Sequence, residues 1–124
     1  MNLNEASTQL YDSLLGGFIW SHILLQEIDN FLAAIHRYVT PGGTVVFIDN
    51  NYVQGSNLPI ALTDAEGNTY QNRQLRDGSI YLVLKNFPSE GYLRRKLEGV
   101  GREVTIINIT YYRILVYKRL PANK

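Results

Sequence analysis

The chain has 124 residues, enough for one domain with a continuous hydrophobic core and too few for two ordinary domains. Its 12 basic and 11 acidic residues leave a formal net charge of +1, which gives no electrostatic reason to expect a nucleic acid or an anionic membrane as partner. Because there is no cysteine, the sequence excludes disulfides, thiolate metal sites and cysteine nucleophiles.

The first residues carry no recognisable targeting pattern. They lack the basic start and the apolar run of a signal peptide. No apolar stretch of the chain approaches the roughly 20 residues that span a bilayer. We therefore expect a cytoplasmic protein without membrane contact, and we interpret residues 1–124 as one domain.

Two elements are predicted before residue 40. Residues 13–18 form a short apolar run that suits a buried strand, and the Gly16-Gly17 pair would end it or let the backbone approach something closely. Ser21 is a suitable N-cap for a helix. Beyond it, apolar side chains recur at helical spacing, which predicts an amphipathic helix over residues 23–38.

A second strand comes after a sharp break. The Pro-Gly-Gly step at residues 41–43 is expected to stop the helix, because proline cannot continue the hydrogen-bond ladder and glycine adopts turn dihedrals. Residues 44–48, "TVVFI", have no polar face. Such a strand is typical of parallel sheets that helices cover on both sides.

The second half of the chain predicts an excursion and an antiparallel finish. A β-hairpin is expected around residues 66–68, and residues 79–85 suit a further strand. A short helix over residues 89–97 precedes two strands in quick succession, 103–110 and 111–120, most simply an antiparallel pair. The order strand, helix, strand requires parallel pairing at the start, so the predicted class is α/β.

Four stretches in this order resemble the C-terminal half of a class I S-adenosylmethionine-dependent methyltransferase, a Rossmann-like family. "YDSLLGGFIWSH" resembles the fourth strand of that fold and its loop, and "YVTPGGTVVFIDN" resembles the helix end and fifth strand. "TDAEGNTYQNRQLRDGS" resembles a hairpin insertion after the fifth strand, here within residues 51–85. "NFPSEGYLRRKLEGVGREVTIINITYYRILVYKR" resembles the closing helix and the sixth and seventh strands. The resemblance implies a partial sheet of order 4-5-7-6, an antiparallel last strand and helices on its faces.

The resemblance also implies a cofactor, S-adenosylmethionine, but the main motif that binds it is not recognisable in this sequence. The family holds this cofactor mainly through a glycine-rich turn after its first strand and an acid that ends its second strand. No such turn stands ahead of Tyr11, and the Gly16-Gly17 pair lies on the segment that resembles the fourth strand. We therefore expect a fragment or short form of such an enzyme, whose activity needs a partner.

Several candidate site residues come after the two predicted parallel strands, at the sheet edge where open α/β sheets bind ligands. The candidate catalytic residues are His22 and Asp49, either of which could accept a proton. The simpler interpretation of His22 is an early helix residue whose ring caps or packs locally, and the acid and amides after residue 48 can be turn formers. By resemblance, the expected cofactor contacts are Gly17, Phe18 and Trp20. The expected substrate pocket contains Asn50 and Tyr52.

Other residues invite simpler interpretations. His36, in the last predicted helical turn, is favoured there by the helix dipole, and two isolated histidines make no metal site. Tyr111 and Tyr112 are interpreted as core or interface residues. A solvated hairpin face is the simplest account of the basic residues Arg73, Arg76 and Lys85.

Two functions remain open from the sequence. One is a methyltransferase-like enzyme with a small-molecule substrate. The other is a non-catalytic homo-oligomeric or small-ligand-binding module. Both share one expectation: without a strand on its outer side, the strand at residues 13–18 presents an uncharged edge that invites further pairing. We therefore expect a homodimer that buries this strand, and Leu14 or Leu15 is the position to test it.

Overall fold

The computed structural model of the protein describes residues 9–55 and 57–121. The strands of this part are β1 (Tyr11–Gly17), β2 (Val39–Asn50), β3 (Ile60–Thr63), β4 (Thr69–Gln74), β5 (Ile80–Leu84), β6 (Gly101–Asn108) and β7 (Tyr112–Arg119). Two short 3-10 turns, η1 (Trp20–His22) and η2 (Leu25–Glu27), lead into the helix α2 (Ile28–His36), and the second helix is α3 (Glu90–Leu97). None of the described helices is long and apolar enough to cross a membrane.

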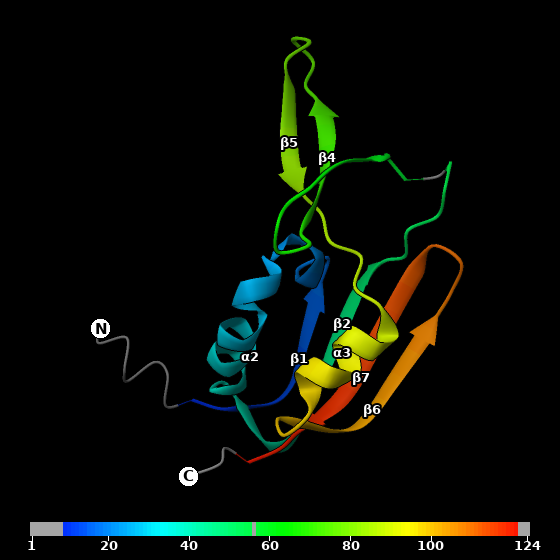
Figure 1. Cartoon of the computed structure of the whole chain (residues 1–124). Coiled ribbons are helices and arrows are strands. Elements are labelled where there is room, and N and C mark those ends of the chain that lie inside the picture. The colour runs from blue at the N-terminus through cyan, green and yellow to red at the C-terminus, as the bar shows by residue number, and fades with distance from the viewer. Residues whose placement is uncertain (1–8, 56, 122–124) are drawn as a thin grey trace, which may run out of the picture.

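The main sheet has the predicted order and directions (Figure 1). Its strands lie side by side as β1-β2-β7-β6, with β1 parallel to β2 and the remaining pairs antiparallel. This is the 4-5-7-6 arrangement expected from the sequence, so the predicted α/β class is confirmed. Strands β3, β4 and β5 form a second, smaller antiparallel sheet that projects from the body.

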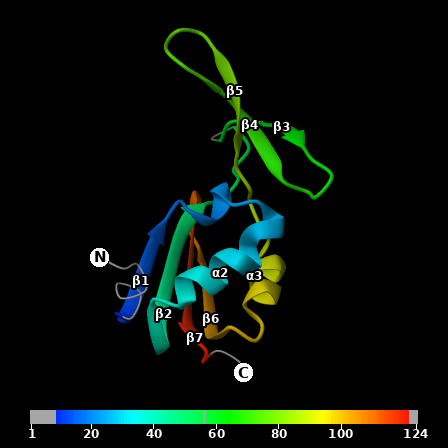
Figure 2. The ribbon, with the colours of Figure 1, turned by 90° about the vertical axis from the view of Figure 1, so that its left-hand side faces the viewer.

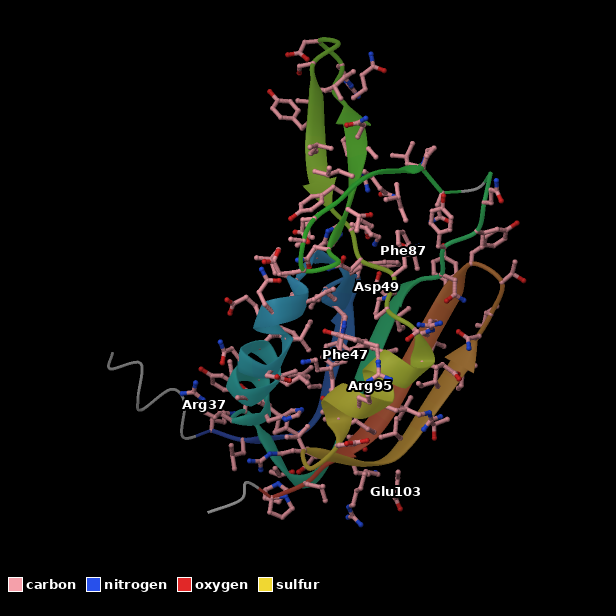
Figure 3. The ribbon with its side chains drawn as sticks, in the orientation of Figure 1. Arg37, Phe47, Asp49, Phe87, Arg95 and Glu103 are labelled. Atoms are coloured by element: carbon pink, nitrogen blue, oxygen red, sulfur yellow. The ribbon has the colours of Figure 1, made fainter. Side chains whose placement is uncertain are left out.

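Both helices cover the same face of the main sheet (Figure 2). The core lies between them and the strands, and it consists of the buried residues Trp20, Ile28, Leu32, Val39, Val45, Phe47, Leu93, Leu97, Leu115 and Tyr117. The ring of Phe47 occupies its centre, 6.0 Å from the Phe31 ring and 5.6 Å from the Trp20 ring (Figure 3). Gly16 on β1 makes room for it, because a Cβ there would lie 2.8 Å from the Phe47 ring.

The opposite face of the sheet is apolar and carries no helix from the described residues. Pairing across the strands places two rows there: Leu15, Val46, Val116 and Thr105, then Gly17, Ile48, Ile114 and Ile107. Leu15 is 71% exposed and Ile107 46% exposed. The expectation that residues 44–48 are buried on both sides therefore holds for the helix-covered face only. β-Branched residues on an open face are typical of a sheet that something else covers.

The first helix is shorter than predicted, and the residues expected to start and to stop it do neither. Ser21 does not cap α2: it lies in η1, and the N-cap residue is Glu27. The Pro-Gly-Gly step does not end the helix, which stops at His36. It lies inside β2, where the pairing register with β1 shifts. Gly42 has a φ of +81°, so the three residues form a bulge at the start of a longer strand.

The second half matches the prediction more closely. The hairpin turn lies between β3 and β4, and Gly67 there has a φ of +90°. Ser89 caps α3, since its side chain accepts a hydrogen bond from the Tyr92 amide. The predicted strand over residues 79–85 is real, but it pairs with β4 in the projecting sheet.

His36 is a core residue and not a surface helix end. It is 6% exposed, and its Nε2 shares a 2.5 Å hydrogen bond with the hydroxyl of the buried Tyr117. Burial, and secondly the charge of Arg119, lowers the pKa of His36 below its usual value of 6.5. Burial raises the pKa of the Tyr117 hydroxyl, so both groups are neutral in the folded protein at neutral pH.

This histidine makes stability depend on pH. Its folded pKa lies below the unfolded one, so this stability is fully present above about pH 6.5 and is lost as the pH falls from there through the lower folded pKa. Urea unfolding of the wild type and of His36→Gln at pH 7.5 and 5.5 measures this effect. The midpoint should fall more for the wild type. Equal falls in both proteins would contradict the assignment.

The packing of Phe47 predicts a large cost for its removal. Phe47→Ala should lower the free energy of unfolding by about 3 to 5 kcal/mol, because the surrounding rings cannot close the cavity. Leu15→Ala on the neighbouring strand is the control, and it should change stability by less than about 0.5 kcal/mol because Leu15 faces solvent. Urea denaturation measures both, and similar costs would show that the core lies elsewhere.

Candidate functional site

The carboxyl ends of β1 and β2 lie together because the two strands are parallel. Gly17 pairs with Ile48, and the Phe18 amide donates to the Ile48 carbonyl over 2.7 Å. The chain turns sharply there, since Phe18 has a φ of +56°, a left-handed conformation that is unfavourable for a bulky residue. Strain of this kind gathers at functional sites.

A buried ion pair lies at this edge. The ammonium of Lys85, a residue only 5% exposed, is 3.2 Å from Oδ1 of Asp49. Lys85 also donates to the Ser21 hydroxyl (2.8 Å) and to the side-chain oxygen of Asn50 (3.0 Å), so all three of its donors are engaged. The second oxygen of Asp49 accepts the backbone amide of Ser21 over 2.8 Å. These four residues, Ser21, Asp49, Asn50 and Lys85, are called the Lys85 cluster below.

The Lys85 cluster joins three parts of the chain. Ser21 comes from η1 after β1, Asp49 and Asn50 end β2, and Lys85 directly follows β5 at the base of the projecting sheet. The carboxylate is therefore fixed in position from two sides. An oriented carboxylate beside a fixed cation can bind a polar substrate or hold a proton acceptor in place.

Lys85 is the residue that sequence reasoning missed. Its interpretation as part of a solvated basic face is wrong, although Arg73 and Arg76 are exposed as expected. The only local sign that Lys85 is buried is that it directly follows an apolar strand. The next residue, Asn86, is also buried, at 3% exposed. Its partner Asp49 lies 36 residues away, and the spacing gives no hint of the contact.

Phe18 and Phe87 lie beside the Lys85 cluster, and together with Tyr52 and Tyr112, which pack against them, they are called the aromatic rim below. The ammonium of Lys85 lies 5.9 Å from the centre of the Phe18 ring and 6.0 Å from that of Phe87. Tyr112 packs edge-on against Phe18 at 6.2 Å, and Tyr52 against Phe87 at 5.1 Å. Asp49 and Phe87 lie where the body meets the projecting sheet (Figure 3). Such rings can bind a planar or cationic group by stacking and cation–π attraction.

The other predicted site residues fall into different places. Asn50 belongs to the cluster and Tyr52, 40% exposed, to the aromatic rim. A Cβ on Gly17 would meet nothing within 4 Å, so a ligand can approach its backbone. His22 is exposed, and its Nδ1 lies 2.8 Å from the Leu84 carbonyl. The two predicted catalytic residues are therefore not hydrogen-bonded to each other.

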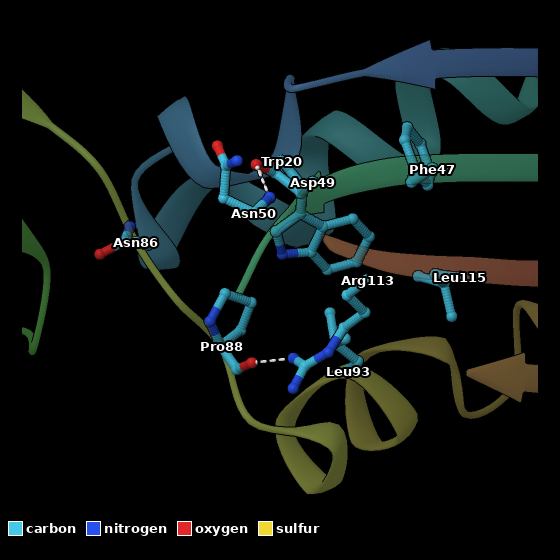
Figure 4. Close-up of a pocket in the computed structure, with 9 residues that line it drawn as sticks. All are labelled: Trp20, Phe47, Asp49, Asn50, Asn86, Pro88, Leu93, Arg113 and Leu115. Carbon is cyan, nitrogen blue, oxygen red and sulfur yellow. Dashed lines mark hydrogen bonds between the residues drawn. The ribbon is translucent and has the colours of Figure 1, made fainter. Parts of the chain in front are cut away.

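Trp20 lies inside the body and not on the rim. It is 3% exposed and lines a cavity of about 30 Å³ with Phe47, Asp49, Asn50, Asn86, Pro88, Leu93, Arg113 and Leu115 (Figure 4). Its indole N–H is one of two buried side-chain groups without a hydrogen-bond partner in the described residues. A cavity of this size holds about one water molecule, which could accept that N–H.

Metal binding has no support in the described part of the chain. No group of three or more histidine or acidic side chains there is placed to hold a metal ion.

The burial of Lys85 predicts that breaking its ion pair is costly. Lys85→Met should lower the free energy of unfolding by about 3 kcal/mol, because it leaves the Asp49 carboxylate without its cation. Adding Asp49→Asn to this variant should restore part of the loss. Urea unfolding of the two single variants and the double variant measures the coupling.

The control is the exposed pair Lys96 and Asp29, which has the same 3.2 Å separation. Lys96→Met should cost less than about 1 kcal/mol, because water screens this pair. Two results would mean that the buried pair contributes no coupling energy. One is an equal loss of unfolding free energy for Lys85→Met and Lys96→Met, and the other is strict additivity of the losses for Lys85→Met and Asp49→Asn.

Comparison with known proteins gives matches in structure alone. No protein-family model and no curated protein sequence matches the chain. DhpI, solved in complex with SAH, matches with a TM-score of 0.68 and 21% identity over 92% of this chain and 50% of DhpI. An S-adenosylmethionine-dependent methyltransferase from Clostridium acetobutylicum ATCC 824 matches with a TM-score of 0.58 and 13% identity, over 98% of this chain and 61% of that one. The CcbJ methyltransferase from Streptomyces caelestis matches with a TM-score of 0.55 and 14% identity, over 96% of this chain and 64% of CcbJ.

These identities are low, so the likeness concerns the fold. The chain spans between half and two-thirds of the length of these three structures. The protein therefore has part of the Rossmann-like α/β fold of S-adenosylmethionine-dependent methyltransferases.

Proposed function

We propose that the protein is a methyltransferase-like chain that forms the substrate side of a methyl-transfer site and needs a partner for activity. The observation that carries this proposal is the Lys85 cluster, which lies at the carboxyl edge of a sheet with the methyltransferase strand order. Ligands of open α/β sheets bind at this edge. Methyl transfer depends mainly on holding two groups in line, which fixed polar residues can do.

Each residue of the site has a role in this proposal. Asp49, oriented by Lys85, binds or deprotonates the methyl acceptor, and Asn50 and Tyr52 line the acceptor pocket. Gly17 and Phe18 contact S-adenosylmethionine, whose positive sulfonium suits an aromatic ring beside a carboxylate. Trp20 supports this contact from the core. His22 is a second candidate base, in reach only if its bond to the Leu84 carbonyl breaks.

The partner in this proposal completes the sheet. It would supply the glycine-rich turn and the ribose-binding acid that the fold uses for its cofactor, neither of which is recognisable ahead of Tyr11. The open apolar face and the outer edge of β1 are the surfaces that it would cover. S-Adenosylmethionine would then bind between the two parts.

The second candidate is a non-catalytic homo-oligomeric or small-ligand-binding module. The exposure of Leu15 on the outer strand β1 favours it, because a second copy could cover that side chain. In this form the homodimer uses residues 13–18, as expected from the sequence. The Lys85 cluster would then have a structural role.

Titration with SAH tests the first proposal. The single tryptophan, Trp20, lies beside Asp49, so its fluorescence should report ligand binding. We expect weak saturable binding in the millimolar range, about −4 kcal/mol, because only part of the cofactor site is present. Phe18→Ala removes the proposed cofactor contact and should abolish this binding, and the control Tyr81→Ala, at an exposed ring on β5, should not.

Two results would count against this proposal. The absence of any SAH binding at several millimolar would favour the non-catalytic module. Methyl transfer by the isolated chain would contradict the need for a partner.

A further inference from the structure

The projecting sheet forms a stiff arm. Figures 1 and 2 show β4 and β5 extending away from the body. Two buried asparagines fix its base: Asn68 is fully buried and bonds the Leu25 amide (2.7 Å), and Asn86 bonds Asn68 (3.1 Å) and the Ile23 carbonyl (3.1 Å). The arm is therefore held at a set position, while its far part contacts nothing else in the described residues.

The arm exposes a large apolar surface to water, and this exposure costs free energy. On one of its faces Ile80 is 64% exposed, Leu82 53% and Leu62 47%. Tyr81 on the other face is 54% exposed. Small sheets of this kind are only marginally stable when neither face packs against another element. Something that covers this surface would stabilise the arm.

The outer edge of β5 has its hydrogen-bonding groups directed outward. The Lys85 amide donates to Thr69 on β4, and the Leu75 amide donates to Ser79 across the hairpin. Odd-numbered residues of β5 therefore point their N–H and C=O groups at β4. By alternation, those of Ile80, Leu82 and Leu84 point to the edge that no described strand covers.

Among the described strands, the other sheet edges carry features that discourage pairing. β6 has Arg102 and Glu103 at a register shift, and Glu103 has a φ of +53°. β3 has four residues and a register shift between Ile60 and Leu62. β1 has a register shift after Tyr11, next to Asp12. β5 has no charge, proline, glycine or bulge, which makes it the least protected edge.

We propose that a second copy of this chain pairs with it through β5, antiparallel, about a two-fold axis at Leu82. In this register Leu82 faces Leu82 of the partner, and Ile80 faces Leu84 of the partner. The outward N–H and C=O groups of Ile80 and Leu82 then gain hydrogen bonds, and so does the Leu84 amide. The Leu84 carbonyl already bonds His22 and accepts a second hydrogen bond with its other lone pair. No two charges meet, because the strand has none. The self-complementary sequence favours a second copy over a different protein.

Pairing about this axis also joins the apolar faces of the two arms. Leu62, Ile80 and Leu82 lie on one face with Tyr70 and Leu84, and the same face of the partner continues the surface. Lys85 follows β5 directly, so a second copy would also stiffen the strand that positions the Lys85 cluster. This inference concerns a different surface from β1, so it competes with the homodimer through residues 13–18 in the second candidate function, and the variants below distinguish the two contacts.

Light scattering over a range of concentrations tests the assembly. The wild type should be a dimer, and Leu82→Lys should raise the dimer dissociation constant at least about 100-fold, because two ammonium groups would meet at the axis. The matched control Leu15→Lys places the same charge on the outer strand of the other sheet, and it should leave the dimer intact. Circular dichroism confirms that each variant is folded.

A cysteine pair tests the register independently of those variants. The natural chain has no cysteine, so Leu82→Cys provides one thiol per copy. Residues facing each other in an antiparallel pair have Cα atoms about 5.5 Å apart, which a disulfide can span. Mild oxidation should therefore link Leu82→Cys into a covalent dimer. Tyr81→Cys, whose counterpart in the partner would lie roughly 8 Å away, should remain unlinked.

Three results would overturn the proposal. One is a wild-type monomer at all concentrations. Another is a dimer that Leu15→Lys breaks and Leu82→Lys does not, which would assign the contact to β1. The last is equal crosslinking of the two cysteine variants, which would exclude this register.

Discussion

The ion pair between Lys85 and Asp49 is the contact on which the arrangement of the site depends. It ties the end of β2 to the base of the arm, and through Ser21 it also fixes the turn after β1. Burying a charged lysine is costly unless its donors are satisfied, and here each of them has an oxygen partner. The same contacts that offset this cost set the orientation of the carboxylate.

The main sheet is covered on one side, and this explains much of the remaining surface. The two helices bury Phe47, Leu115 and Tyr117 on one face. The alternate side chains of the same strands, such as Val46 and Ile48, form an apolar face without a covering layer in the described residues. Strand β1 leaves an edge beside that face, and β5 leaves a second edge on the arm. Both proposed partners are inferred from these surfaces.

Much of the fold could be predicted from local pattern. The apolar strands, the amphipathic helix and the Ser89 cap each depend on neighbouring residues, and the strand order followed from the resemblance. The predictions that were wrong concern residues whose structure depends on a contact with a distant segment of the chain. A Cβ on Gly43 would lie only 2.9 Å from the Asp12 carbonyl oxygen, so the Pro-Gly-Gly step packs closely against β1 and forms a strand bulge. Ser21 bonds Asp49 instead of capping the helix, and His36 turns inward to Tyr117.

The sequence by itself determined the class of the fold, the direction of its strands and the edge of the sheet at which polar residues gather. These properties depend on periodicity and on chain order, which short stretches carry. Only the tertiary structure decided which of those polar residues meet. Lys85 looked like one basic residue among several, and burial against a carboxylate 36 residues away made it the centre of the site. Pairing of this kind depends on the path of the whole chain, because no local spacing encodes it.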